Sequence, residues 1–369
     1  MARGRRQGVL IAGGGVAGCL AALALARHRP EVPLLIVEER ETFGGPGFHH
    51  YFEDELEDGA RALVDDLAVA RWPGFYVAFD NFSRKLKAAC GGLDGAALHR
   101  AMVETLAPNQ YRLDTRIVAV REDALVLDGG EEIKAEGAID ARGAANLSQL
   151  DLGYEARLER RYRFSAPHGV DRPVLIDATA NGGNGTGFFQ VAPLDDERLV
   201  VADVCLADRS LPGEQAAARL DHYVALRGWR GGEIEDGAVV TKPLPRGGDF
   251  AAFWRIGGAR VAKLGLRGGF VHPVTGRTIA DAASAAILLT RQQDFAGAAL
   301  HDLFEGEARR MWRGRGFLRA INRTLADADG RAGRLAALFA LDPGLITRFH
   351  ADRLGMFERM KVQRAVGGG

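Results

Sequence analysis

Glu38 lies at a fixed spacing from a group of glycines near the start of the chain. It follows the apolar run "PLLIV" and stands 20 residues after Gly18 of the stretch "GGGVAG". A carboxylate at this spacing accepts hydrogen bonds from the hydroxyl groups of a ribose. Gly13 permits a tight turn, and Gly15 lets a pyrophosphate approach the N-terminus of the helix that follows. Together these residues predict a dinucleotide site.

The elements that position these residues form a strand, turn, helix and strand unit. Val9–Ala12 is a short apolar run, "CLAALALARHR" favours a helix, and "PLLIVEE" is typical of a second buried strand. Gly18 lets the helix pack closely against the first strand. A glycine-rich turn without a ligand would leave the position of Glu38 unexplained, so the unit favours nucleotide binding.

The region from 111 to 143 decides between NAD and FAD. The stretch "YRLDTRIVAVREDALVLDGGEEIKAEGAIDARG" alternates apolar and polar residues, and Gly129 and Gly130 indicate a hairpin turn. A small hairpin sheet that returns to the dinucleotide sheet is typical of flavoproteins. Asp140 and Gly143 would then bring the chain back beside the pyrophosphate. Alternatively, Asp140 and Arg142 form only a surface ion pair of small energy.

A second glycine-rich stretch, "GLRGGFVHPVTG" from Gly265 to Gly276, lies in the last third of the chain. Glycine lets backbone approach a ligand, and backbone N–H groups in such loops cradle phosphates. The same residue types are also common in plain turns. His272 has two interpretations. It shuttles a proton near a flavin ring, since histidine titrates near neutral pH, or it only satisfies backbone groups in a turn.

The composition excludes several classes of protein. The chain has 369 residues, of which 47% are hydrophobic, enough for at least one large core. Its 48 basic and 48 acidic residues balance, so net charge gives no reason to expect a nucleic acid partner. Cys19, Cys90 and Cys205 show no metal-like spacing and are interpreted as free thiols in a reducing compartment. Glycines interrupt the first apolar segment too early for a secretory signal or a membrane-spanning helix.

Short motifs run through nearly the whole chain. They are "GGPGFHHYFEDEL", "DARG", "PVLIDAT", "NG" before a Phe-rich strand and "PL", "GLRGGFVHPVTG" and "MWRGRGFLRAINRTL". Their order resembles that of the bacterial FAD-dependent lycopene β-cyclases of carotenoid biosynthesis. The resemblance implies reduced FAD as cofactor, NAD(P)H as external reductant and a lycopene-like polyene as substrate. It also implies an isomerase: a terminal C=C is protonated, the carbocation closes a β-ionone ring, and a proton leaves without net redox change.

Such a reaction needs a dry tunnel, because water would trap the carbocation as an alcohol. Aromatic faces stabilise a cation without reacting with it. The aromatic candidates for the tunnel lining are Phe48, Tyr51, Phe188, Phe189, Phe270 and Phe317. Each is either a lining residue or an ordinary core residue, and the adjacent Phe188 and Phe189 must face opposite sides of a strand. The resemblance adds His49 and Ala202 to the substrate-binding positions.

The sequence departs from the family at an acidic pair. Family members carry Glu followed by Asp or Glu on the strand after the "PL" turn, where "RLVVADVCLAD" has Ala202 and Asp203. Alanine cannot transfer a proton. The resemblance therefore implies slow cyclisation with Asp203, or the reduced flavin, as the acid. Asp203 would serve only if its side chain points into the tunnel, because strand residues alternate faces. Pro46, Gly47 and His49 also replace family residues.

On this interpretation the second glycine-rich stretch is the wall of the flavin site opposite the first glycine turn, with Gly268, Gly269 and Gly276 as cofactor-binding residues. Asp177, at the end of "PVLID", either faces the tunnel or caps a helix. Three functions stay open: an active cyclase, a low-activity protein that binds FAD and a polyene, and a FAD-dependent monooxygenase or polyene-modifying reductase.

The predicted fold class is α/β: a Rossmann-like dinucleotide-binding flavoprotein fold with an inserted mixed β-sheet domain and a helical C-terminal tail. We expect three regions: a FAD-binding domain at 1–60, 110–145 and 265–295, a substrate-binding domain at 61–109 and 146–264, and a helical region at 296–366. Gly330 and Pro343 are expected to break the helical tail.

The tail also bears on localisation. The stretch "RRMWRGRGFLRAINRTLADADGRAGRLAALFAL" mixes Arg with Trp, Phe and Leu at near-helical spacing. Such a pattern either binds an anionic membrane surface or covers the tunnel. Because a carotene is insoluble in water, the resemblance implies a cytoplasmic protein that is peripheral on the inner face of the cell membrane.

Overall fold

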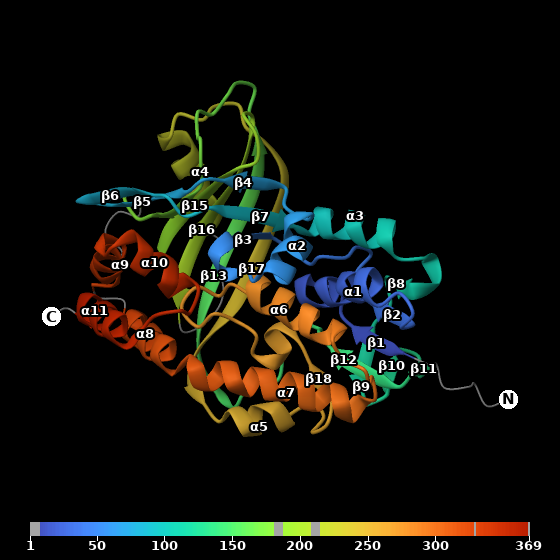
Figure 1. Ribbon diagram of the computed structural model, residues 1–369. Coiled ribbons are helices and arrows are strands. Elements are labelled where there is room, and N and C mark those ends of the chain that lie inside the picture. Colours follow the sequence, from blue (N-terminus) through green and yellow to red (C-terminus); the bar gives the residue numbers. More distant parts are fainter. Residues whose placement is uncertain (1–7, 181–186, 208–214, 328–329, 368–369) are drawn as a thin grey trace.

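A computed structural model describes residues 8–180, 187–207, 215–327 and 330–367. The "NG" dipeptides before the Phe-rich strand fall within 181–186, outside the described residues. A parallel sheet, a larger mixed sheet and a group of C-terminal helices organise the described part of the molecule (Figure 1).

A five-stranded sheet forms the nucleotide-binding half. Its order is β18-β12-β1-β2-β8, and each neighbouring pair is parallel. The strands are β1 (Val9–Ala12), β2 (Leu34–Val37), β8 (Tyr111–Arg112), β12 (Gly137–Asp140) and β18 (Ala262–Lys263). Every residue of β1, β2 and β12 is buried, as expected for parallel strands that are covered on both faces.

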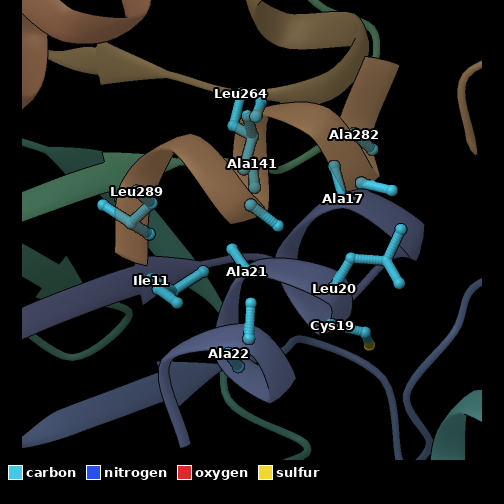
Figure 2. Close-up of a cluster of buried hydrophobic side chains, with 14 of the residues drawn as sticks. Ile11, Ala17, Cys19, Leu20, Ala21, Ala22, Ala141, Leu264, Ala282 and Leu289 are labelled. Atoms are coloured by element: carbon cyan, nitrogen blue, oxygen red, sulfur yellow. The ribbon is translucent and has the colours of Figure 1, made fainter. Parts of the chain in front are cut away.

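Helix α1 (Val16–His28) leaves β1 and packs against α6 (Ile279–Thr290). The contact is rich in alanine, and Figure 2 shows Ala17 and Ala21 of α1 with Ala282 and Leu289 of α6 in one buried cluster. The helix also lies close to the turn that precedes it. A Cβ atom at Gly18 would lie 1.9 Å from the carbonyl oxygen of Gly13, so only glycine fits there.

The predicted hairpins form a separate three-stranded antiparallel sheet in the order β11-β10-β9. Its strands are β9 (Ile117–Val120), β10 (Ala124–Leu127) and β11 (Glu132–Lys134). Gly129 and Gly130 make the turn between the last two strands with φ of +92° and +86°, values that L side chains rarely adopt. The chain then enters β12, so the hairpins return it to the parallel sheet.

A seven-stranded mixed sheet forms the other half, in the order β17-β13-β16-β15-β14-β5-β6. Its strands are β5 (Phe75–Phe79), β6 (Phe82–Leu86), β13 (Leu150–Arg163), β14 (Val174–Asp177), β15 (Gly187–Pro193), β16 (Arg198–Ala207) and β17 (Glu233–Gly248). Only β14 and β5 pair in parallel among the pairings of the described residues in this sheet. The predicted Phe-rich strand is β15 and the predicted strand with Ala202 and Asp203 is β16, while β13 lies between β16 and β17.

A small three-stranded sheet and several short helices complete the two halves. The sheet has the order β3-β7-β4, from β3 (Phe48–Phe52), β4 (Ala70–Trp72) and β7 (Cys90–Asp94). The helices are α2 (Asp58–Asp65), α3 (Gly95–Thr105), α4 (Gln215–Leu226) and α5 (Phe250–Arg255), with the short 3-10 helices η1 (Glu53–Glu55), η2 (Pro108–Gln110) and η3 (Gly265–Gly268).

The two faces of the seven-stranded sheet are covered by different helices. On one face, Phe188 and Ala202 belong to a core that includes residues of the C-terminal helices. On the other face, Phe189 and Val201 pack with residues of α4. Four C-terminal helices gather beside this sheet (Figure 1), namely α8 (Gly316–Ala326), α9 (Arg331–Ala340), α10 (Pro343–His350) and α11 (Met356–Gly367). The preceding helix, α7 (Gly297–Gly314), packs instead against β12 and β18 of the parallel sheet.

The predicted fold class is confirmed, with a mixed α/β architecture, a parallel dinucleotide-type sheet and a helical C-terminus. Gly330 precedes α9 and Pro343 opens α10, as expected from their limits on helical backbone. Among the described residues, no helix combines the length and the apolar character that crossing a bilayer requires.

Candidate active site

The first glycine turn opens into a cleft at the N-terminus of α1. Gly13, with φ of +96°, and Gly15 both line this cleft, which encloses about 560 Å³. No side chain caps the helix at Gly15, so the N–H groups of its first turn are open to a ligand. A Cβ atom at Gly15 would meet no heavy atom within 4 Å. The space in front of the helix is therefore free for an anion.

Glu38 lines the same cleft at the end of β2 and is 8% exposed. Its carboxylate accepts hydrogen bonds from the backbone N–H of Gly14 at 2.5 Å and of Arg40 at 3.1 Å. These two bonds fix the carboxylate beside the glycine turn. A carboxylate oxygen has a second lone pair for another donor, such as a ribose hydroxyl group.

Asp140 is fully buried behind the cleft and holds two arginine residues that line it. Arg142 donates two hydrogen bonds to its carboxylate, each 2.9 Å long, and Arg267 donates a third at 2.9 Å. Burial raises the pKa of Asp140, but the hydrogen bonds from Arg142 and the charge of Arg267 hold it below its ordinary value. Because Asp140 is 1% exposed, the alternative of a surface ion pair is wrong.

The guanidinium group of Arg267 gives the cleft a hydrogen-bond donor for a cofactor that is rich in acceptors. Its Nη1 atom is buried and has no hydrogen-bond partner in the described part of the chain, and Arg267 lines the cleft. An unmatched buried donor of this kind favours a ligand that brings an oxygen or nitrogen acceptor. The first turn of α1, Glu38 and Arg267 are thus polar groups that would suit FAD in this cleft.

The second glycine-rich stretch contributes to the cleft through other residues than expected. Gly265, Leu266 and Arg267 line the cleft, but Gly268, Gly269 and Gly276 do not. Gly269 ends the short helix η3 with left-handed backbone, and a Cβ atom at Gly276 would lie 3.3 Å from the Lys242 side chain. The cofactor contacts predicted for these three glycines stay predictions.

A second cavity lies between the seven-stranded sheet and helices α8, α9 and α10. It encloses about 120 Å³, and its walls come largely from the core on that face of the sheet. The apolar lining residues are Phe52, Leu175, Ile176, Phe188, Leu206, Leu244, Val274, Leu325, Ala326, Leu335, Leu338, Phe339 and Phe349. Such walls exclude water and suit an apolar chain.

One end of this cavity is charged and adjoins the cleft. Glu155 on β13 and Lys242 on β17 are buried, and Lys242 Nζ lies 3.8 Å from Glu155 Oε1. Among the described residues, Lys242 alone lines both the cleft and the cavity. Burial, together with the charge of Arg157, lowers the pKa of Lys242 to about 8. The junction of the two spaces thus holds a carboxylate and an amine within one ion pair.

The comparisons with known proteins decide the family. A family model described as lycopene cyclase protein matches residues 8–365. The chain belongs to the lycopene cyclase family. It is 30% identical over 361 residues to a lycopene beta-cyclase of Pantoea ananas, which covers 96% of this chain and 93% of that protein. It is 31% identical over 366 residues to a lycopene beta-cyclase of Paracoccus sp. (strain N81106 / MBIC 01143), with shares of 96% and 92%.

Solved structures, among them a flavin-dependent enzyme, share the fold at low identity. A geranylgeranyl bacteriochlorophyll reductase-like protein from Thermoplasma acidophilum superposes with a TM-score of 0.65 and 12% identity, covering 98% of this chain and 96% of that chain. A flavin-dependent halogenase from Xanthomonas campestris gives a TM-score of 0.62 at 14% identity, with shares of 99% and 94%. At this identity the likeness shows the fold alone, which is that of flavin-dependent enzymes.

In this lycopene cyclase family member, Asp203 lies on the face of the sheet that α4 covers. Arg219 donates two hydrogen bonds to its Oδ2 atom, at 2.9 and 2.5 Å. Burial raises the pKa of Asp203 despite the opposing effect of Arg219. Ala202, one residue earlier, belongs to the core on the cavity face. The structure therefore gives Asp203 no contact with the cavity, and its catalytic role stays a prediction.

His272 and Asp177 both hold local structure. The Nδ1 atom of His272 accepts hydrogen bonds from the backbone N–H groups of Val274 and Thr275, each 3.3 Å long. His272 lines neither the cleft nor the cavity. Burial and the charge of Arg277 keep its pKa well below the ordinary value. This placement matches the turn interpretation. Asp177 accepts hydrogen bonds from Thr179 and Tyr223, so it neither lines the cavity nor caps a helix.

The predicted substrate residues are dispersed. Phe188 lines the cavity, whereas Phe189 stacks on Tyr223 on the opposite face with ring centroids 4.1 Å apart. His49 lines the cleft. Phe48 is buried in the core on the cavity face, and Tyr51 is buried in the nucleotide-binding half. Substrate contact by these residues stays a prediction, with Phe188 placed best for it.

Sequence reasoning missed the charged row on β13. Glu155, Arg157 and Glu159 are 7%, 3% and 6% exposed, and their spacing of two places all three on the cavity face. In register, Glu159 lies opposite Ala202 on β16 and Glu155 lies opposite Lys242 on β17. The signal was the alternation of charge in "YEARLERRYR". Such a pattern usually marks an exposed strand, so it gave no reason to expect a buried site.

Proposed function

We propose that this protein cyclises the end of an acyclic polyene in the apolar cavity, with FAD bound in the adjoining cleft and no net redox change. The observation that carries the proposal is the junction at Lys242, where a nucleotide-type cleft meets an apolar cavity. Membership of the lycopene cyclase family and the flavoprotein fold support it. The division into a FAD-binding domain, a substrate-binding domain and a helical C-terminal region, with the boundaries predicted above, is part of this proposal.

The cleft residues have separate tasks in this proposal. The first turn of α1 at Gly15 holds the pyrophosphate, Glu38 holds a ribose, and Arg267 binds an acceptor of the cofactor. Bound in its reduced form, with NAD(P)H as external reductant, FAD would supply an electron-rich ring to the reaction. The chain itself must then exclude water and handle the proton that the ring loses.

Glu155 is placed to handle that proton. It is the one carboxylate among the described residues that line the cavity. A carboxylate stabilises a nearby carbocation and accepts a proton from it, and Lys242 holds this carboxylate in position. The proton gained at the terminal double bond would come from the reduced cofactor, the donor left when Asp203 has no contact with the cavity, and the proton lost from the ring goes to Glu155, so the product is an isomer of the substrate. Ala202 takes no part in proton transfer.

Expression in a bacterium that accumulates lycopene tests this function. Chromatography of the pigments should show cyclic product, and purified protein with reduced FAD should form rings without consuming NAD(P)H stoichiometrically. One NADH oxidised per ring under anaerobic conditions would instead indicate the reductase alternative. Oxygen uptake coupled to product formation would indicate a monooxygenase.

We also propose that α11 contacts a membrane surface. Met356, Phe357 and Met360 are 73%, 75% and 56% exposed, and Arg359 and Lys361 lie in the same helix. Exposed apolar side chains beside basic ones suit the boundary of an anionic bilayer. A variant with Ser at all three apolar positions should bind anionic vesicles several-fold more weakly in a flotation assay. Unchanged flotation would refute this contact.

A further inference from the structure

The charged end of the cavity holds buried polar atoms that no protein group satisfies. In the described part of the chain, Arg157 Nε, Thr275 Oγ1 and His350 Nε2 are buried without a hydrogen-bond partner, and all three residues line the cavity. Arg157 and His350 are 3% and 6% exposed. A buried polar atom left unpaired is costly, so these atoms call for water or a ligand.

These three atoms are hydrogen-bond donors, whereas a fourth unpaired buried atom on a described residue that lines the cavity, His50 Nδ1, donates or accepts according to the tautomer of its ring. Arg277 Nη2 donates to His350 Nδ1 at 3.0 Å, so in the neutral ring the proton is on Nε2. His350 is neutral because burial and the charge of Arg277 keep its pKa well below the ordinary value. Arg157 Nε is a donor by its chemistry, and the Thr275 hydroxyl group can donate. What these atoms lack is therefore an acceptor.

The donors belong to one contiguous region around Lys242. The loop that carries Thr275 passes the lysine side chain, since a Cβ atom at Gly276 would lie 3.3 Å from Lys242 Cδ. Arg157 on β13 faces the same space as Lys242. Arg157 forms an ion pair with Glu159, and Arg277 forms one with Glu55. Charge is thus largely balanced, and the unmatched property of this end is its excess of donors.

A pure hydrocarbon does not match this end of the cavity. Before binding, water can supply the acceptors that the three donors require. A hydrocarbon end would expel this water and leave the donors unpaired, which costs affinity. An oxygen atom on the ligand would replace the water, and a carboxylate would do so best because hydrogen bonds to an ionised acceptor are the stronger ones.

We propose that the polyene bound here carries an oxygen function, with a carboxylate preferred, on the end group that lies toward the flavin cleft. Arg157, Thr275 and His350 donate to that oxygen, while the leucine and phenylalanine walls hold the adjoining hydrocarbon. The proposal deepens the proposed function because it names the substrate class of the same cavity. The volume of about 120 Å³ suits the enclosure of an end group rather than of a whole polyene.

Binding to the FAD-loaded full chain in detergent tests the proposal without relying on turnover. The probes are an acyclic polyene carboxylic acid, its methyl ester, and the hydrocarbon with the same number of conjugated double bonds. Co-elution of polyene absorbance with the protein, over a series of polyene concentrations, gives each affinity. We expect the acid to bind about tenfold or more tightly than the hydrocarbon, with the ester in between.

Two isosteric variants identify the donors. Thr275→Val and His350→Phe each remove one of these donors, and circular dichroism with thermal melting checks that both variants remain folded. Both should bind the acid about fivefold to tenfold more weakly and the hydrocarbon no more weakly. Thr290→Val is the matched control, because Thr290 Oγ1 already donates to the Ile287 carbonyl at 2.7 Å and lies outside the cavity. It should leave the preference for the acid unchanged.

Three outcomes separate this inference from the proposed function. Hydrocarbon binding as tight as acid binding, or an unchanged preference in both variants, overturns the inference. Ring formation from the hydrocarbon with no preference for the acid leaves the cyclase function standing alone. Selective binding of the acid that depends on Thr275 and His350, without any ring product, supports the inference and contradicts the cyclase function.

Discussion

The flavin cleft is formed mainly by backbone motifs, whereas the apolar cavity is formed by side chains. The cleft is formed by short local motifs, in which backbone N–H groups and glycines contact the ligand space. The cavity is formed by side chains from β3, β13 to β17 and three C-terminal helices, which lie far apart in sequence. Backbone motifs keep one shape while side chains vary. The cleft can therefore retain its ligand class while the cavity changes its own.

Gly15→Leu should break the cleft without harming the fold, and we expect the largest effect from it. No heavy atom lies within 4 Å of a Cβ at this position, so the new side chain fills only the space in front of α1. Steric overlap with the pyrophosphate, at roughly 3 kcal/mol, should weaken FAD binding about a hundredfold. Flavin absorbance after reconstitution and dialysis measures it.

Gly306→Leu is the control for this substitution. Gly306 is exposed on α7, and a Cβ there also meets nothing within 4 Å. This variant should retain flavin like the parent protein, and both should give the same circular dichroism spectrum. If Gly15→Leu keeps its flavin, the pyrophosphate does not lie at this helix.

The glycine turn and Glu38 of the cleft could be predicted because they are close in sequence. The spacing of Gly13, Gly15, Gly18 and Glu38 follows from the length of one helix and one strand, so a linear pattern carries the geometry. The partners of Asp140 show the limit of this reasoning. Arg142 is a near neighbour and was noticed, whereas the contact with Arg267 joins residues 127 positions apart. Nothing in a linear pattern indicates that contact.

The cavity could not be predicted because its geometry depends on strand register. A strand pattern shows that Ala202 and Asp203 face opposite sides, but not which side carries the cavity. The packing of the C-terminal helices against the Ala202 face settles this, and the pairing of β13 with β17 places Glu155 beside Lys242. Burial of the charged row on β13 also depends on the C-terminal helices, which lie more than a hundred residues further along the chain.

Glu155→Gln should sharpen the comparison on the cavity side. The amide cannot accept the proton, so ring formation with reduced FAD should fall about a hundredfold, while FAD binding in the cleft stays unchanged. Asp203→Asn is the matched control, because Asp203 lies on the α4 face with Arg219. Equal losses in both variants, or a loss only in Asp203→Asn, would return the catalytic role to Asp203.

Ala202→Glu should raise the rate of ring formation, by about tenfold. Ala202 is directly opposite Glu159 in the sheet, on the cavity face. Two carboxyl groups that share one site cannot both ionise easily, so the new group should keep its proton near neutral pH and act as a general acid. Product formed per minute over the pH range 6 to 8 measures this gain. No gain in a folded variant would mean that the proton does not come from this strand.

His350→Phe should change how stability depends on pH, which is the smallest effect. Burial and Arg277 depress the pKa of His350 in the folded protein, so between its ordinary value near 6.5 and the folded value the unfolded chain binds the extra proton. Stability from this group is complete above pH 6.5 and is lost as pH falls. Phenylalanine retains the stacking against Phe52 but takes up no proton.

The free energy of unfolding of the variant, relative to the parent, should therefore rise by about 1.4 kcal/mol per pH unit below pH 6.5. Urea unfolding at pH 7.5 and pH 5.5 measures it. A difference that stays constant over this range would mean that the pKa of His350 is not depressed in the folded protein, and would remove the neutral donor that the proposed binding of an oxygen function requires.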